Sequence, residues 1–133
     1  MASILRVNTL TDASSNTSVA TRVLFNGRAK AWGNLDGTGT IAIRDSYNIS
    51  SAVDGRTGYY TFNYSSNMTN DDYSASENVA ETSGFEGHMN RYPAIDGIAT
   101  NKITFGATFK PTGSSAANYD VDELYVTIFG DLA

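Results

Sequence analysis

Short runs of alternating apolar and polar residues, separated by turn-forming residues, recur along this chain and limit the folds that it can adopt. The clearest runs are residues 59–64, 102–109 and 123–129, in which every second residue is apolar or aromatic. Side chains two apart lie on the same face of a strand, so each run predicts a half-buried strand. No segment sustains a helical period, and turn signals fall roughly every 8–12 residues. The sequence predicts an all-β fold, an antiparallel β-sandwich. A jelly-roll variant stays open because the pattern does not choose the strand order.

The middle of the chain carries further strand signals. Residues 40–50 form one predicted strand whose apolar face includes Ile43 and Tyr47, with Asp45 on that face at a bulge or satisfied by a hydrogen bond. An Asp-Gly pair at 54–55 and a glycine at 58 predict a hairpin into the next strand.

The second half of the chain is read in the same way. Residues 73–79 begin another strand, and residues 80–100 are predicted to form a long loop that carries a short strand. The runs at 102–109 and 123–129 are predicted to pair with each other across the loop at 110–120.

The N-terminal part differs from the rest in its pattern. Residues 4–10 alternate as a short strand would, residues 11–17 are polar, and residues 19–25 fit either a strand or a helical turn. We expect residues 1–25 to form a leader that serves as an attachment segment, with a first strand of the same sheet as the alternative. Residues 26–133 then form one β-sandwich domain, a usual size for a domain.

Composition excludes several functional classes. The chain has no cysteine, so disulfides, thiolate metal sites and cysteine nucleophiles are ruled out. Its formal net charge is −5 and only 17% of its residues are charged, which leaves no broad cationic surface for nucleic acid. No apolar stretch approaches the length of about 20 residues that a membrane span requires, so no membrane insertion is expected.

Residues that could carry catalysis are few. His88 is the only histidine and follows Glu86 on a glycine-bearing segment, where an ordinary loop residue is the favoured interpretation. The acidic clusters at 71–72 and 120–123 match no EF-hand loop and indicate solvated turn residues. We therefore predict no enzyme, no catalytic or metal-ligating residue and no cofactor.

Aromatic residues are the remaining candidates. Tyrosine presents a rigid, half-polar ring that stacks on sugars or anchors an interface. Residues in or beside predicted turns, or opposite the apolar set, are the candidate contacts; these are Tyr59, Tyr73, His88, Tyr92 and Tyr119. The alternative is that tyrosines fill the sheets, and the two interpretations weigh equally for Tyr92 and Tyr119.

Two nearby segments carry a distinctive pattern, residues 27–51, GRAKAWGNLDGTGTIAIRDSYNISS, and residues 57–64, TGYYTFNY. They contain a Lys-Ala-Trp strand, a short loop, an Arg-x-Ser-(Phe/Tyr)-Asn strand and a Gly-x-Tyr-x-(Phe/Val)-Asn-(Tyr/Phe) strand. This pattern resembles that of a family of β-sandwich domains common in bacteriophage structural proteins. The opening ASILRVNTL at 2–10 and the closing VDELYVTIFGD at 121–131 also fit, while the resemblance thins between 80 and 100.

The resemblance implies a structural protein of the virion, a tail-fibre-like or receptor-binding appendage component. It implies other virion proteins as partners, a homo-oligomer with a trimer favoured, and host surface glycan as a further ligand. A capsid decoration (cement) protein is the alternative, and a polysaccharide-degrading enzyme a distant one. The family pattern carries over no catalytic residue.

Overall fold

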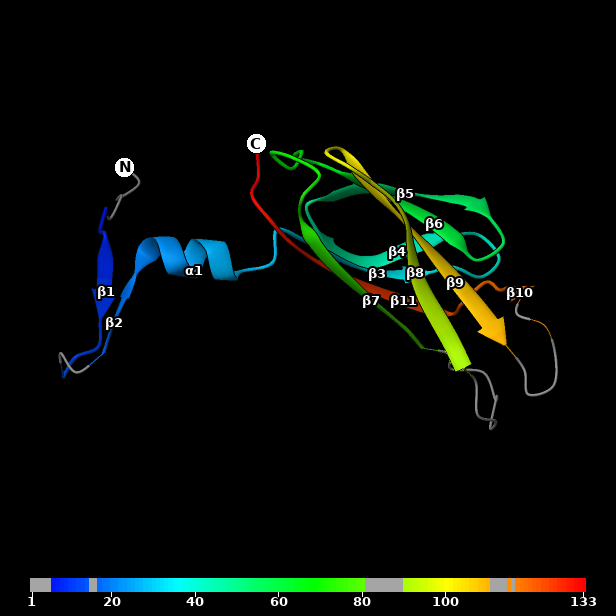
Figure 1. Cartoon of the computed structure of the whole chain (residues 1–133), viewed down its shortest axis with the longest axis horizontal. Helices are drawn as coiled ribbons and strands as arrows, with labels where there is room; N and C mark the ends of the chain where they lie inside the picture. Colours follow the sequence, from blue (N-terminus) through cyan, green and yellow to red (C-terminus); the bar gives the residue numbers. More distant parts are fainter. Residues whose placement is uncertain (1–5, 15–16, 81–89, 111–114, 116) are drawn as a thin grey trace.

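Two antiparallel sheets packed face to face form the body of the molecule (Figure 1). The structure, a computed structural model, describes residues 6–14, 17–80, 90–110, 115 and 117–133. One sheet has the order β4-β3-β11-β7. Its strands are β3 (Ala31–Asp36), β4 (Ala42–Tyr47), β7 (Ser74–Ala80) and β11 (Glu123–Phe129). The predicted all-β sandwich is confirmed.

The second sheet has five strands, with β9 at its centre. Its strands are β5 (Ile49–Arg56), β6 (Tyr59–Tyr64), β8 (Asn90–Ala99), β9 (Lys102–Lys110) and β10 (Ala117–Asn118). Strand β9 pairs with β8 along one edge and with β6 and then β10 along the other, and β5 pairs with β6.

The core lies between the inner faces of the two sheets. It follows the predicted alternation, because Tyr60, Phe62 and Tyr64 of β6 are all buried while the residues between them are half-buried. Opposite them, Gly33 leaves room for the Phe62 ring, since a Cβ at residue 33 would lie 3.3 Å from Phe62 Cε1. The other large residues in this layer are Leu35, Ile103, Phe105, Leu124, Val126 and Ile128.

The predicted single strand at 40–50 is wrong, because the chain changes sheet within it. Asn48 has φ of 57° and separates β4, in one sheet, from β5, in the other. Asn48 Nδ2 donates to Ser66 O at 3.0 Å and Ser66 N donates to Asn48 Oδ1 at 2.7 Å, which fixes the corner. Asparagine tolerates this left-handed conformation better than most residues. The predicted bulge at Asp45 is confirmed, because Asp45 pairs with Asn34 while Ile43 pairs with Leu35 and the register shifts between the two pairs. Asp45 Oδ1 also accepts a hydrogen bond from Ser46 N at 2.8 Å.

The predicted hairpin between β5 and β6 is confirmed. Its turn is formed by Thr57 and Gly58, since Arg56 pairs with Tyr59 and Gly58 has φ of 72°. Asp54 and Gly55 instead lie within β5, where the register shifts.

Residues 80–100 were predicted to form a long loop that carries a short strand, and in the described part the strand is present but is ten residues long rather than short. Residues 90–99 form β8, which pairs with β9 along its whole length. Pro93 is tolerated because β8 is an edge strand, and a register shift between Ile95 and Gly97 breaks the alternation that would have revealed the strand.

The predicted pairing of 102–109 with 123–129 is wrong as well. These runs are β9 and β11, which lie in opposite sheets and face each other across the core. Both have the predicted buried face, with Ile103 and Phe105 on one and Leu124 and Val126 on the other. Alternation fixes which side chains are buried, whereas pairing partners depend on the connections between strands.

The leader projects from the body as a separate unit (Figure 1). Strands β1 (Thr9–Thr11) and β2 (Ser18–Ala20) form a two-stranded sheet of their own, and α1 (Thr21–Gly27) follows. The segment 19–25, read as strand or helical turn, contains the end of β2 and most of α1. Lys30 joins leader and body, because its Nζ donates to Phe25 O at the end of α1 while its N donates to Ile128 O at 2.7 Å.

Candidate functional site

The outer surface of the four-stranded sheet carries a group of exposed aromatic side chains. Trp32 of β3 pairs with Tyr47 of β4, and Trp32 also pairs with Thr127 of β11. Tyr125 and Phe129 lie two residues to either side of Thr127 on the same outward face. Since diagonal neighbours on one face lie within reach of aromatic rings, Trp32 is central to the group. We call these four residues the aromatic face.

The rings of the aromatic face are presented to solvent. Trp32, Tyr47, Tyr125 and Phe129 are 38%, 43%, 38% and 42% exposed, while Ala31 and Gly33 on either side of Trp32 are buried. Aromatic residues held on a rigid sheet with part of the ring in water are typical of surfaces that contact a partner.

Charged groups border the aromatic face at one end. Arg44 Nη2 donates to Asp36 Oδ2 at 3.0 Å, and Arg44 Nη1 pairs with Glu123. The Tyr125 hydroxyl donates to Glu123 Oε2, so this ion-pair network positions a ring of the aromatic face. Because Asp36 also accepts hydrogen bonds from Thr38 N and Oγ1, together with the one from Arg44, its pKa lies below the usual value.

None of the residues nominated from the sequence belongs to the aromatic face, but a signal for it was present. Tyr125 and Phe129 alternate with the apolar set of β11, and Trp32 alternates with Ala31 and Gly33. Large aromatic residues at positions where a half-buried strand should be polar indicate an exposed ring, and this could have been read from the sequence.

The nominated tyrosines are scattered over the molecule. Tyr73 is not a surface contact, because its side chain is only 7% exposed and packs edge-on against Tyr64. Its hydroxyl lies 3.1 Å from Ala99 O and 3.1 Å from Lys102 O, so it holds a corner together. Burial raises the pKa of Tyr73.

Tyr59 and Tyr119 lie near the β5–β6 turn, in the other sheet. The Arg56 guanidinium stacks 3.8 Å from the centre of the half-buried Tyr59 ring, which covers Gly106. Tyr119 is 38% exposed, and its N donates to Ala107 O at 3.2 Å. For Tyr92 the structure gives only the backbone pairing with Thr108 in β8 and β9, and His88 lies outside the described residues.

The acidic cluster at 120–123 has structural roles. Asp120 Oδ1 accepts from Gly58 N at 2.7 Å and lies 3.1 Å from the Tyr60 hydroxyl, while Glu123 belongs to the network with Arg44. Within the described ranges, no group of three or more His, Cys, Asp or Glu residues is placed to hold a metal ion. No helix in the described residues is long and apolar enough to cross a membrane.

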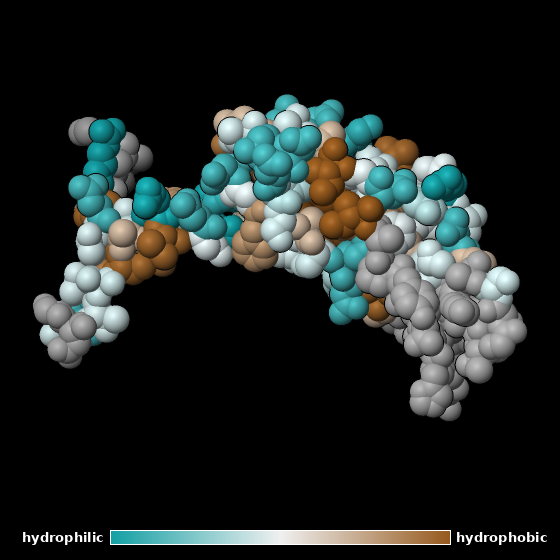
Figure 2. Space-filling view, viewed as in Figure 1, coloured by the Kyte–Doolittle hydropathy of each residue, from teal (hydrophilic) through white to brown (hydrophobic). Residues whose placement is uncertain are grey.

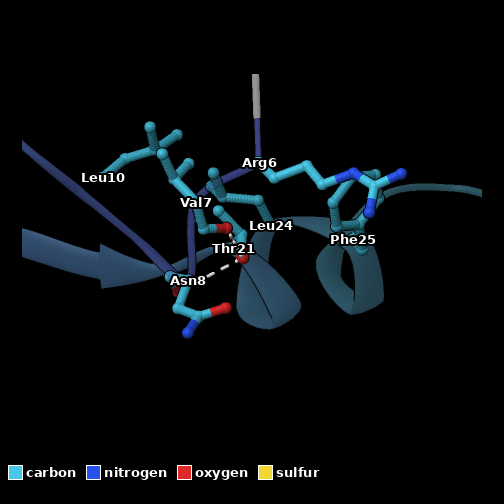
Figure 3. Close-up of a pocket in the computed structure, with 7 residues that line it drawn as sticks. All are labelled: Arg6, Val7, Asn8, Leu10, Thr21, Leu24 and Phe25. Carbon is cyan, nitrogen blue, oxygen red and sulfur yellow. Dashed lines mark hydrogen bonds between the residues drawn. The ribbon is translucent and has the colours of Figure 1, made fainter. Parts of the chain in front are cut away.

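The leader forms a second exposed apolar surface (Figure 3). Thr21, the first residue of α1, holds the helix to the segment before β1, because its Oγ1 lies 3.0 Å from Val7 O and 3.2 Å from Asn8 O. A hollow of about 560 Å³ between them is lined in part by Leu10, Leu24 and Phe25. No residue of α1 is buried. This segment therefore holds its shape without a core of its own.

Comparison of the chain with protein-family models, with curated proteins and with solved structures found no match.

Proposed function

We propose that this chain is a non-enzymatic structural component of a bacteriophage virion, of the tail-fibre-like or receptor-binding kind, that binds host surface glycan through the aromatic face. The observation that carries the proposal is the outward grouping of Trp32, Tyr47, Tyr125 and Phe129 on one rigid sheet. The resemblance of residues 27–51 and 57–64 to virion β-sandwich domains supplies the biological setting.

The chemistry of the aromatic face suits a saccharide. Pyranose rings expose apolar C–H groups on one side and hydroxyls around the rim. An aromatic ring packs against the first, and carboxylates and guanidinium groups hydrogen bond to the second. Arg44, Asp36 and Glu123 lie at the border of the rings and can make such hydrogen bonds.

The single tryptophan of the chain provides the test, because it is Trp32 itself. Purified chain is titrated with bacterial surface polysaccharides, one lipopolysaccharide or capsule preparation at a time, and Trp32 fluorescence is followed. We expect one preparation to change the fluorescence saturably, and Tyr47→Ala or Tyr125→Ala to weaken binding about tenfold, close to 1.4 kcal/mol.

The matched control is Val53→Ala. Val53 is an apolar residue on the five-stranded sheet with 49% exposure, and its truncation should leave binding unchanged. Equal weakening by Val53→Ala and Tyr47→Ala would argue against recognition by the aromatic face. Saturable binding to empty phage heads, with no binding to cells or polysaccharide, would favour the decoration protein instead.

The decoration alternative has one observation in its favour. The leader exposes Val23, Leu24 and Phe25 at 57%, 47% and 55%, as an arm that inserts into another protein would. Deleting residues 1–27 should then abolish binding to particles while the remaining sandwich stays folded.

A further inference from the structure

We infer that the leader of one copy docks on the open side of the sandwich of a second copy, between the edge strands β7 and β8. This goes beyond glycan binding, since it concerns how copies of the chain assemble. The receiving surface consists of Ile95, Ile98, Asp71, Asp72 and Asp96, and we call it the open edge.

The open edge is apolar at its centre. Ile95 and Ile98 are 42% and 41% exposed although they pair with Phe105 and Ile103 and so point toward the inner side of the sheet. Their exposure arises because β8 is the last strand of its sheet and the facing sheet ends at β7. Figure 2 shows hydrophobic side chains on the body where β7 and β8 meet.

Three exposed carboxylates lie beside this apolar strip or near its end. Asp96 lies between the two isoleucines on β8 and is exposed. Asp71 and Asp72 are exposed just before β7, and the contact of the Tyr73 hydroxyl with Ala99 O brings that segment against the end of β8. The open edge is therefore apolar and acidic.

The leader has the complementary character. Its exposed apolar residues include Leu24 and Phe25. Figure 2 shows hydrophobic side chains on the surface of the leader. Residues 1–28, which run to the residue after α1, hold three cationic side chains, Arg6, Arg22 and Arg28, and one carboxylate, Asp12, which is a net charge of +2. Since the whole chain carries −5, residues 29–133 carry −7, and the Lys30 among them is buried at the junction. The cationic, apolar leader of one copy is therefore attracted to the acidic, apolar open edge of another copy.

The arm of the same copy is held away from its own open edge. Lys30 N bonds to Ile128 O of the body, and Lys30 Nζ bonds to Phe25 O near the end of α1, so only residues 28 and 29 lie between the end of α1 and Lys30. This short connection restricts the reach of the arm toward the open edge of its own copy. Because the leader and the open edge are different surfaces, each copy can bind the next one, and the assembly closes into a ring when the rotation between successive copies permits it.

The absence of cysteine from the chain allows a direct test by disulfide cross-linking. A tagged Leu24→Cys chain is mixed with an untagged Ile98→Cys chain and oxidised gently. We expect a disulfide between the two chains. The control partner, Val53→Cys, has a similarly exposed apolar side chain on β5, far along the other edge of the sheet, and should give no more cross-link than background.

Charge reversal supplies an independent readout by analytical ultracentrifugation of the purified full-length chain. Arg22→Glu with Arg28→Glu, or Asp72→Arg with Asp96→Arg, should weaken association about tenfold, and a chain with both reversals should regain it. A monomer at all concentrations, equal cross-linking to Val53→Cys, or a disulfide formed within a single chain that carries both Leu24→Cys and Ile98→Cys would overturn the proposal. These measurements use neither glycan nor particles, so their outcome is separate from that of the proposed function.

Discussion

The hydroxyl of Tyr60 lies 3.1 Å from Asp120 Oδ1, which joins the start of β6 to a segment 60 residues further along the chain. The same hydroxyl accepts a hydrogen bond from Val121 N at 3.1 Å and lies 3.2 Å from Gly37 O. Two separate segments, at residue 37 and at residues 120–121, are thus fixed around one side chain that has no exposed surface.

Replacement of this hydroxyl should be costly. Tyr60→Phe leaves Val121 N without its acceptor in a buried position, and we expect the free energy of unfolding to fall by about 1–3 kcal/mol. Urea denaturation measures the loss. Tyr47→Phe is the control, because Tyr47 is 43% exposed, and it should change stability by no more than about 0.5 kcal/mol.

Two glycines with similar backbone angles should respond differently to alanine. Gly39 has φ of 58° with open space around it, whereas a Cβ on Gly58, at φ of 72°, would lie 2.6 Å from Ala107 O and 2.8 Å from Tyr119 N. Gly39→Ala incurs only the backbone cost of about 1–2 kcal/mol. Gly58→Ala adds a steric clash with backbone, so its midpoint of denaturation should fall clearly further. Equal effects would contradict the close packing of the β5–β6 turn against Tyr119.

Substitutions at Asn48 separate the contribution of its side-chain hydrogen bonds from that of its left-handed backbone conformation. Asn48→Gly keeps the left-handed backbone and loses the hydrogen bonds with Ser66, at a cost of about 0.5–1 kcal/mol each. Asn48→Ala loses the same bonds and adds about 1 kcal/mol or more for its backbone conformation. Thermal unfolding should therefore rank the wild-type chain above Asn48→Gly, and Asn48→Gly above Asn48→Ala.

Alkaline pH should destabilise the fold. Burial raises the pKa of Tyr60, Tyr64 and Tyr73 above the ordinary value of 10.0. The folded chain then holds these protons more tightly than the unfolded chain. Their contribution is complete below pH 10 and declines above it, by at most about 1.4 kcal/mol per pH unit for each tyrosine. Denaturation curves on both sides of pH 10 measure the decline, and Tyr60→Phe should reduce its slope.

Alternation of residues was a reliable guide to burial and a poor one to connectivity. The inward faces of β6, β9 and β11 were predictable because a half-buried strand repeats every second residue. The change of sheet at Asn48 was not, since the apolar pattern continues through it and only its positive φ marks the corner. The length of β8 was not predictable either, because Pro93 and the bulge near Gly97 disrupt the pattern at an edge where both are tolerated, so that only a short strand was predicted there.

The candidate site was harder to predict from the sequence than the fold. Tyr73 follows a polar turn, which favours an exposed ring, yet its ring packs against Tyr64 because the chain there closes the end of the sandwich. Trp32 and Tyr125 are 93 positions apart in the numbering and come together only because β3 and β11 are neighbours. The residue pattern within a single strand does not indicate which strands are neighbours in the sheet.

Lys30 determines how a mechanical load would cross this molecule. Its backbone is bonded to β11 and its amine to the end of the leader, and Trp32 lies two residues further along the chain, in β3. A pull on the leader that is resisted at the aromatic face would therefore pass along the start of β3. It would act along the strand direction, where the hydrogen bonds to β4 and β11 share the force in shear. Between Lys30 and Trp32 this path crosses the core only at the small side chain of Ala31, so such tension need not open the sandwich.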